Sequence, residues 1–157
     1  MKPESITIQN LEAAFAGESM AHIKYRYFAR LARELGDADT ARIFEETASQ
    51  EVEHAFGHLD LLYPKAKLTP AKALEIAIEG ETYEYTEMYP KFRHLALEEG
   101  NTAAVKEFDE QIAESKQHAE SFKLVLAKAA RRFAALAKVE ERHANQYKAA
   151  LVKANAR

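Results

Sequence analysis

Apolar residues recur every three or four positions along nearly the whole chain, which is the spacing of amphipathic helices. Only five glycines and four prolines interrupt this pattern. Pro70 suits the first turn of a helix, whereas Pro90 lies inside the same helix and should kink it. Helices are predicted over residues 8–34, 38–62 and 70–98, and residues 101–157 form either one very long helix or two helices with an unmarked break.

The connections between these helices predict how they pack. The links "ELGDADT" and "EEGN" are short turns, whereas "YPKAKLTP" is longer. This connectivity is that of an antiparallel four-helix bundle with an extended or additional C-terminal helix. Residues 1–157 are therefore predicted to form a single domain.

The C-terminal region contains an internal repeat. Residues 108–128 and 133–153 look like tandem copies offset by 25 residues, which is about seven helical turns, so both copies can present the same face of one helix. Three positions of the first copy have counterparts in the second: Phe108, His118 and Phe122 correspond to Phe133, His143 and Tyr147.

Composition narrows the class of protein. The net charge is -3 with the two signs interspersed, which does not favour binding to nucleic acid or an anionic membrane. The absence of cysteine excludes disulfides and thiolate metal sites within these residues. With no apolar run of membrane-spanning length and no signal-peptide pattern, we expect a cytoplasmic location.

Several polar residues interrupt the apolar faces. Glu18 lies on the inward face of the first predicted helix, Glu51 and His54 on that of the second, and Glu81 and Glu84 on that of the third. An unpaired buried carboxylate costs several kcal/mol, so such groups should bind a metal or share protons.

Counting from the turns places these residues at one depth. Glu18 and His54 lie equally far from Gly36 along the chain, one before it and one after it. Glu81 and His118 lie before and after Gly100 at nearly the same separation. At ~1.5 Å of rise per residue, all four lie ~27 Å from the turns. Carboxylates and imidazoles at one level of a bundle suit two iron or manganese ions.

The last pair of ligands has two candidates. In the first copy of the repeat, Ser115 stands three residues before His118, and Glu114 points about 100° away unless a π-bulge rotates it inward. The second copy has a complete pair, Glu140 and His143, but lies 25 residues farther along. A swapped assembly, in which the long helix reaches a neighbouring subunit, would accommodate that pair, which we favour over His118 with Glu114.

Four stretches carry a family resemblance: "AFAGESMAHIKY", "QEVEHAFGHLD", "IEGETYEYTEMYP" and "KVEERHANQY". They resemble the rubrerythrins and short relatives such as sulerythrin, which are ferritin-like di-iron proteins. The resemblance implies a non-haem di-iron peroxidase that reduces hydrogen peroxide to water in oxidative-stress defence. It also implies that the metal ligands include Glu18, Glu51, His54, Glu81 and Glu84.

The same resemblance assigns further roles and partners. Glu84 matches the extra carboxylate of the family, a ligand that the iron exchanges for a histidine when its redox state changes. Tyr25 and Tyr85 match tyrosines that donate hydrogen bonds or protons near the site. Because full-length rubrerythrins add a cysteine-ligated rubredoxin domain, the electrons here should come from a separate, rubredoxin-like donor. We expect a homodimer, with helix swapping as one form of it. The alternative function is an iron oxidase or metal-storage protein that uses O₂, with manganese or mixed metal as the alternative cofactor.

Overall fold

The computed structural model describes residues 5–155 of the chain. They form two compact helical units, divided between Leu68 and Thr69. The single-domain prediction stays a prediction, and its limits at residues 1 and 157 lie outside the described residues.

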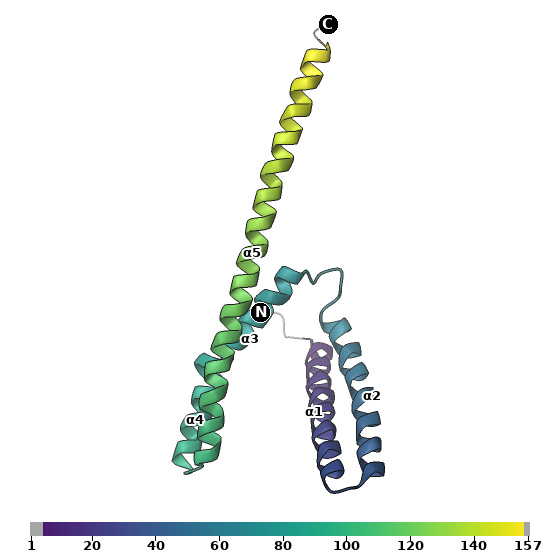
Figure 1. The fold of residues 1–157 in the computed structure, drawn as a ribbon, viewed down its shortest axis with the longest axis vertical. Helices are drawn as coiled ribbons and strands as arrows, with labels where there is room; N and C mark the ends of the chain where they lie inside the picture. Colours follow the sequence, from purple (N-terminus) through teal and green to yellow (C-terminus); the bar gives the residue numbers. More distant parts are fainter. Residues whose placement is uncertain (1–4, 156–157) are drawn as a thin grey trace. The chain divides into compact units, whose positions relative to one another are not determined.

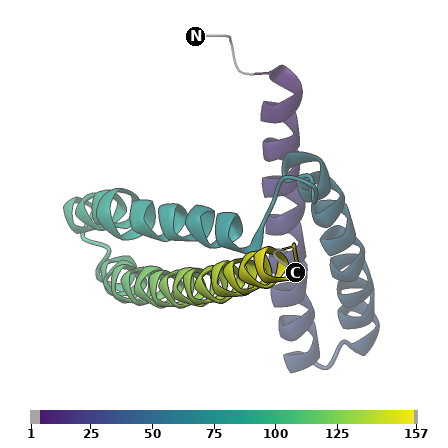
Figure 2. The same ribbon diagram turned by 90° about the horizontal axis from the view of Figure 1, so that it is seen from above.

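The first unit is an antiparallel hairpin of α1 (Ile6–Glu34) and α2 (Ala38–Leu62), which run side by side in both views (Figures 1 and 2). The predicted bounds of α2 are confirmed, and α1 begins two residues before its predicted start. The side chain of Asp37 accepts a hydrogen bond from the Thr40 amide at 3.0 Å. This cap satisfies a free N–H at the start of α2 and lowers the pKa of the Asp37 carboxyl.

The second unit consists of α3 (Pro70–Tyr83), a π-helical turn η1 (Glu84–Met88), α4 (Tyr89–Glu98) and α5 (Thr102–Asn155). The prediction of one helix over 70–98 with a kink at Pro90 is therefore wrong. A π-helical turn interrupts the helix, and it begins at Glu84, ahead of Pro90. The Tyr89 amide bonds to the Glu84 carbonyl, five residues back, and Pro90 has no N–H. The chain takes up one extra residue in η1, so Pro90 falls in the first turn of α4.

The region after residue 101 is one helix of 54 residues, which settles the choice between one helix and two (Figure 1). The Asn101 side chain accepts a hydrogen bond from the Ala104 amide at 3.1 Å and so caps its first turn. Its first half packs on α3, η1 and α4.

The two hairpin turns have the same construction. Gly36 and Gly100 adopt φ angles of +82° and +70°, in the left-handed region. In each turn the amide after the glycine bonds to a carbonyl five residues back, Asp37 to Ala32 and Asn101 to Ala96, both at 2.9 Å. This is the Schellman motif, and it requires a residue that tolerates positive φ.

Small residues make the closest contacts within each hairpin. Among the residues whose burial the structure describes, the buried apolar ones are all alanines: Ala29, Ala32, Ala41, Ala48, Ala55, Ala96 and Ala119. Aromatic rings pack beside them, with the half-buried Phe44 against the half-buried Tyr25 and the exposed Phe28 in the first unit. Phe108 packs against Tyr89 and Phe92 in the second. Each hairpin by itself therefore leaves much of its large apolar surface uncovered.

The fold class agrees with the prediction. Within residues 5–155 every regular element is helical, which confirms the all-α class. None of the described helices combines the length and apolarity needed to cross a membrane.

Opposite effects are expected from the same substitution at two glycines. Gly100→Ala should lower the free energy of unfolding by about 1–2 kcal/mol, because a Cβ disfavours left-handed backbone. Gly57→Ala, inside α2 and with no atom within 4 Å of an added Cβ, should raise it by up to about 1 kcal/mol. Urea unfolding of the full chain measures both, and equal effects at the two sites would contradict this assignment of the turn.

Candidate metal centre

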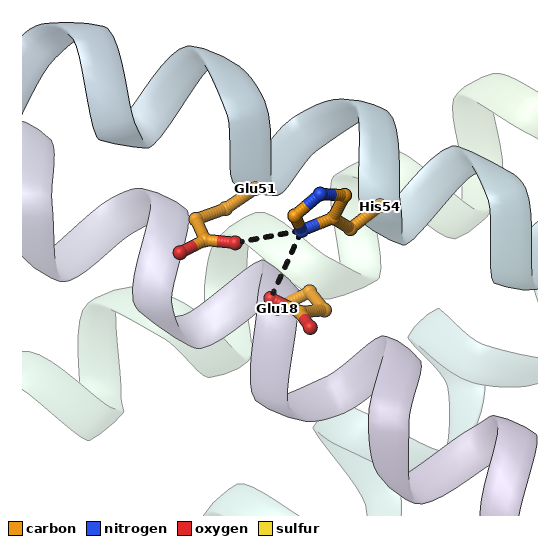
Figure 3. A group of neighbouring side chains, drawn as sticks. All are labelled: Glu18, Glu51 and His54. Carbon is orange, nitrogen blue, oxygen red and sulfur yellow. Dashed lines mark hydrogen bonds and ion pairs between the residues drawn. The ribbon is translucent and has the colours of Figure 1, made fainter.

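The first unit brings together three predicted site residues on the facing sides of α1 and α2 (Figure 3). His54 Nδ1 lies 3.0 Å from Glu51 Oε2 and 3.9 Å from Glu18 Oε2. Ligand atoms of all three residues lie within 4.8 Å of one another. The depth predicted by counting from Gly36 is therefore correct within this hairpin.

The second unit holds a matching cluster between α3 and α5. His118 Nδ1 lies 3.4 Å from Glu81 Oε1. The other carboxylate oxygen, Glu81 Oε2, is buried without a hydrogen-bond partner among the described residues. Both clusters thus present the same ring nitrogen, Nδ1, to a carboxylate, and counting from Gly100 also gave the correct depth.

Ser115 connects Glu84 to this second cluster. Its side chain is buried, with the residue 3% exposed, and its Oγ donates a hydrogen bond to Glu84 Oε2 at 2.9 Å. Ser115 occupies the α5 position where the bundle pattern calls for a carboxylate, three residues before a histidine. A carboxylate nevertheless reaches that place, because Glu84 at the start of η1 points toward α5.

The π-helical turn also decides which tyrosine lies next to the second cluster. Tyr25 follows Glu18 by seven residues, and with the extra residue of η1 the equivalent position after Glu81 is Tyr89, eight residues on. Both rings pack against a phenylalanine of the facing helix. Burial, and then the charges of Glu84 and Glu81, raise the pKa of the Tyr89 phenol. Counting along a regular helix puts Met88 at this position and therefore missed Tyr89. Pro90 is the signal in the sequence that could have shown the irregular turn and so identified Tyr89.

Within residues 5–155, no hydrogen bond or ion pair joins the remaining predicted residues to these clusters. Tyr25 and Tyr85 are half-buried, and neither side chain forms a hydrogen bond within the described part of the chain. Glu114 is exposed on a regular α-helical part of α5, so the π-bulge that it needs to turn inward does not occur there. Glu140 and His143 are exposed in the second half of α5. Their role as ligands stays a prediction.

The chemistry of the two clusters fits hard divalent cations. Carboxylate oxygens with one imidazole each are donors that iron and manganese accept. In the first cluster, His54 Nδ1 needs a proton to donate a hydrogen bond to Glu51, and that proton stands where a cation could bind. In the second cluster, Glu81 Oε2 is buried and has no hydrogen-bond partner within residues 5–155. The residues present therefore fit a metal site.

Comparison with known proteins agrees with this chemistry. The rubrerythrin family model matches residues 9–126. Nigerythrin from Nitratidesulfovibrio vulgaris is 38% identical over 128 residues, which are 74% of this chain and 63% of that protein. A putative rubrerythrin from Methanocaldococcus jannaschii is 35% identical over 145 residues, covering 76% and 69% of the two chains. A solved structure of nigerythrin in its fully reduced, all-ferrous state matches 82% of this chain and 70% of that one, with 35% identity and a TM-score of 0.40.

The chain belongs to the rubrerythrin family. This confirms the predicted family and its ferritin-like, di-iron class, and two iron ions are the cofactor of that family. This family assignment rests on the similarity of the amino-acid sequences. Because the chain spans less than two thirds of nigerythrin, the activity of such a whole protein is a matter for proposal.

Removing the Ser115 hydroxyl tests its contact with Glu84. Ser115→Ala should lower the free energy of unfolding by about 1–2 kcal/mol, because a buried hydroxyl bonded to a carboxylate is lost. Ser121→Ala is the matched control: that serine is exposed on the same helix and bonds only to the Gln117 carbonyl, so little change is expected. Chemical denaturation compares the two, and equal losses would contradict a specific role for Ser115.

Proposed function

We propose that this chain is a di-iron oxidoreductase that reduces hydrogen peroxide to water with electrons from a separate donor. The observation that carries the proposal is the pair of carboxylate–Nδ1 clusters, one in each hairpin and at the same distance from their turns. Membership of the rubrerythrin family supports it, since that family works with peroxide and rubredoxin-type donors.

The proposed ligands are drawn from both clusters. Glu18, Glu51 and His54 would come from the first, and Glu81, Glu84 and His118 from the second, so each hairpin supplies two carboxylates and one imidazole. This is the donor set of ferritin-like di-iron proteins, with Glu84 in place of the carboxylate that Ser115 lacks. Glu140 and His143 remain the second candidate pair and would require the swapped assembly.

The protein's own groups would hold the metal ions, orient the peroxide and deliver protons to it. Bound ferrous iron would supply the two electrons that peroxide takes up as its O–O bond breaks, and two protons complete the two water molecules. Tyr25, Tyr85 and Tyr89 are the proposed proton donors. Burial and the charges of Glu84 and Glu81 raise the pKa of the Tyr89 phenol, so this phenol gives up its proton less readily than an ordinary tyrosine. Ser115 would hold one oxygen of Glu84, which leaves the other free for a metal.

Electrons would come from outside these residues. The 157 residues contain no cysteine, so none of them can hold a thiolate-bound iron. A rubredoxin-like protein or domain is the proposed donor. Ferroxidase activity with O₂ is the alternative, since the same donor set suits both reactions.

Metal content separates the two candidate ligand pairs. Wild type reconstituted anaerobically with iron and manganese should hold about two ions per chain. His118→Ala should lower this to about one or fewer, whereas Glu140→Ala should leave it unchanged. Elemental analysis measures the content, and His94→Ala, on the surface of α4, is the matched histidine control. Loss of metal in Glu140→Ala but not in His118→Ala would contradict this and would show that the ligands lie in the second copy of the repeat.

Reaction kinetics test the activity itself. Stopped-flow oxidation of the ferrous protein should be faster with hydrogen peroxide than with O₂. Tyr25→Phe should slow the peroxide reaction by about 10²-fold with unchanged metal content, because a proton donor is removed. Faster oxidation by O₂ would count against the peroxidase and favour the ferroxidase.

A further inference from the structure

A groove with a volume of about 790 Å³ runs along the first hairpin, between side chains of α1 and α2. From α1 it is lined by His22, Arg26, Arg30 and Arg33, and from α2 by Ser49 among others. All of its lining residues belong to this one hairpin, so the groove is a feature of the first unit by itself. We name it the arginine groove.

One row of side chains leads from the first metal cluster into the arginine groove. Glu18, His22, Arg26 and Arg30 follow one another on α1 at intervals of four residues. Four residues turn an α-helix by about 40° more than a full circle. The row therefore starts at Glu18, on the side that faces α2, and moves gradually onto the outer side of the hairpin at the two arginines.

A hydrogen bond ties the inner end of the groove to the facing helix. His22 Nδ1 donates to the Ala48 carbonyl at 2.7 Å, because a carbonyl can only accept. His22 lies one turn after Glu18 on α1, and Ala48 lies one turn before Glu51 on α2. The groove thus ends one helical turn from two of the proposed ligands, and this hydrogen bond links the two helices there.

Two arginines of the groove have positive charge to offer a partner. Arg26 forms no hydrogen bond and no ion pair within the described part of the chain. Arg30 is only loosely paired, since its Nε lies 4.0 Å from the Glu34 carboxylate. Arg33 differs from both, because it donates two hydrogen bonds to the Glu45 carboxylate, at 2.8 and 2.6 Å.

The cost of burying charge says what can cover these two arginines. A guanidinium that is removed from water without an acidic partner costs several kcal/mol. Whatever else packs against the hairpin, Arg26 and Arg30 therefore stay in water or meet an anionic surface. Residues 22–33 reinforce this preference, since they contain four cations and no acid.

We propose that the arginine groove is the docking surface for the electron donor, a rubredoxin-like protein or domain with acidic side chains around its own iron. This rests on the proposed function, which takes its electrons from outside these residues. Arg26 and Arg30 attract and orient the acidic surface, and the His22 end of the groove brings the donor close to the first cluster. Two encounters, each oxidising one ferrous donor, return the two electrons that peroxide takes up.

Binding of a redox-inert donor tests the docking surface without turnover. Zinc-substituted rubredoxin is titrated into the full chain at low salt, and calorimetry measures the dissociation constant. Arg26→Glu should weaken binding by about tenfold or more, and added salt should weaken binding to the wild type. Lys24→Glu is the matched control, because it makes the same change of charge on the same helix outside the groove. It should change the constant by less than about threefold.

Two binding results would overturn the proposal. Equal weakening by Arg26→Glu and Lys24→Glu would show a general attraction between the proteins and no specific role for the groove. Absence of binding to the wild type at low salt would show that a rubredoxin does not dock on this chain. Arg26→Gln should show the same effect as Arg26→Glu in weaker form, and it replaces that variant if circular dichroism shows lost helicity.

Kinetics distinguish the docking surface from the activity itself. Oxidation of the ferrous protein by peroxide needs no donor, so Arg26→Glu should keep the wild-type rate in stopped flow. Its reduction by rubredoxin at low donor concentration should be about tenfold slower, whereas reduction by the methyl viologen radical, a small cation, should be no slower. An unchanged rate with rubredoxin would overturn the docking surface alone. Slow oxidation by peroxide in the wild type as well would count against the proposed function.

Discussion

The inward-facing carboxylates set the constraint on which the rest of this protein depends. Glu51 and Glu81 have side chains only 16% and 22% exposed, and each lies beside a histidine on the facing or the same helix. Carboxylates gathered in this way repel one another and lose hydration, so the arrangement is stable only with protons or cations among them. A metal centre is the arrangement that satisfies this constraint with the residues present.

Both hairpins meet that constraint with the same parts. Each turn is closed by a glycine at positive φ, and each helix after the turn is capped by an Asp or Asn side chain. An arginine then joins the two helices near each turn, Arg33 to Glu45 and Arg93 to Asp109. These exposed ion pairs contribute little energy, but together with the turns they hold the facing helices in register, which sets the level of the histidines.

The two hairpins differ at Ser115, and the difference is compensated locally. A serine at a position that calls for a carboxylate removes one negative charge from the second cluster. Glu84 then lies within hydrogen-bond distance of the same position from the opposite helix. Since π-helical turns are uncommon and often occur at functional sites, η1 following Glu84 is consistent with this compensation.

Much of this protein was determined by its sequence alone. The apolar period and the two glycine turns were enough to predict the helices and the depth at which Glu18 and His54, or Glu81 and His118, would meet. The family was predicted separately, from the resemblance of four sequence stretches. These features depend on local propensity and on counting at a constant rise per residue, which hold wherever the helix is regular.

Only the tertiary structure decided the rest. The extra residue in η1 moved Tyr89, rather than Met88, to the place equivalent to Tyr25, and regular counting cannot anticipate such an insertion. The contact between Ser115 and Glu84 depends on how two helices 31 residues apart in sequence pack together. That α5 continues unbroken through both copies of the repeat was likewise left open by the sequence, because an α-helix without glycine or proline has no marked end.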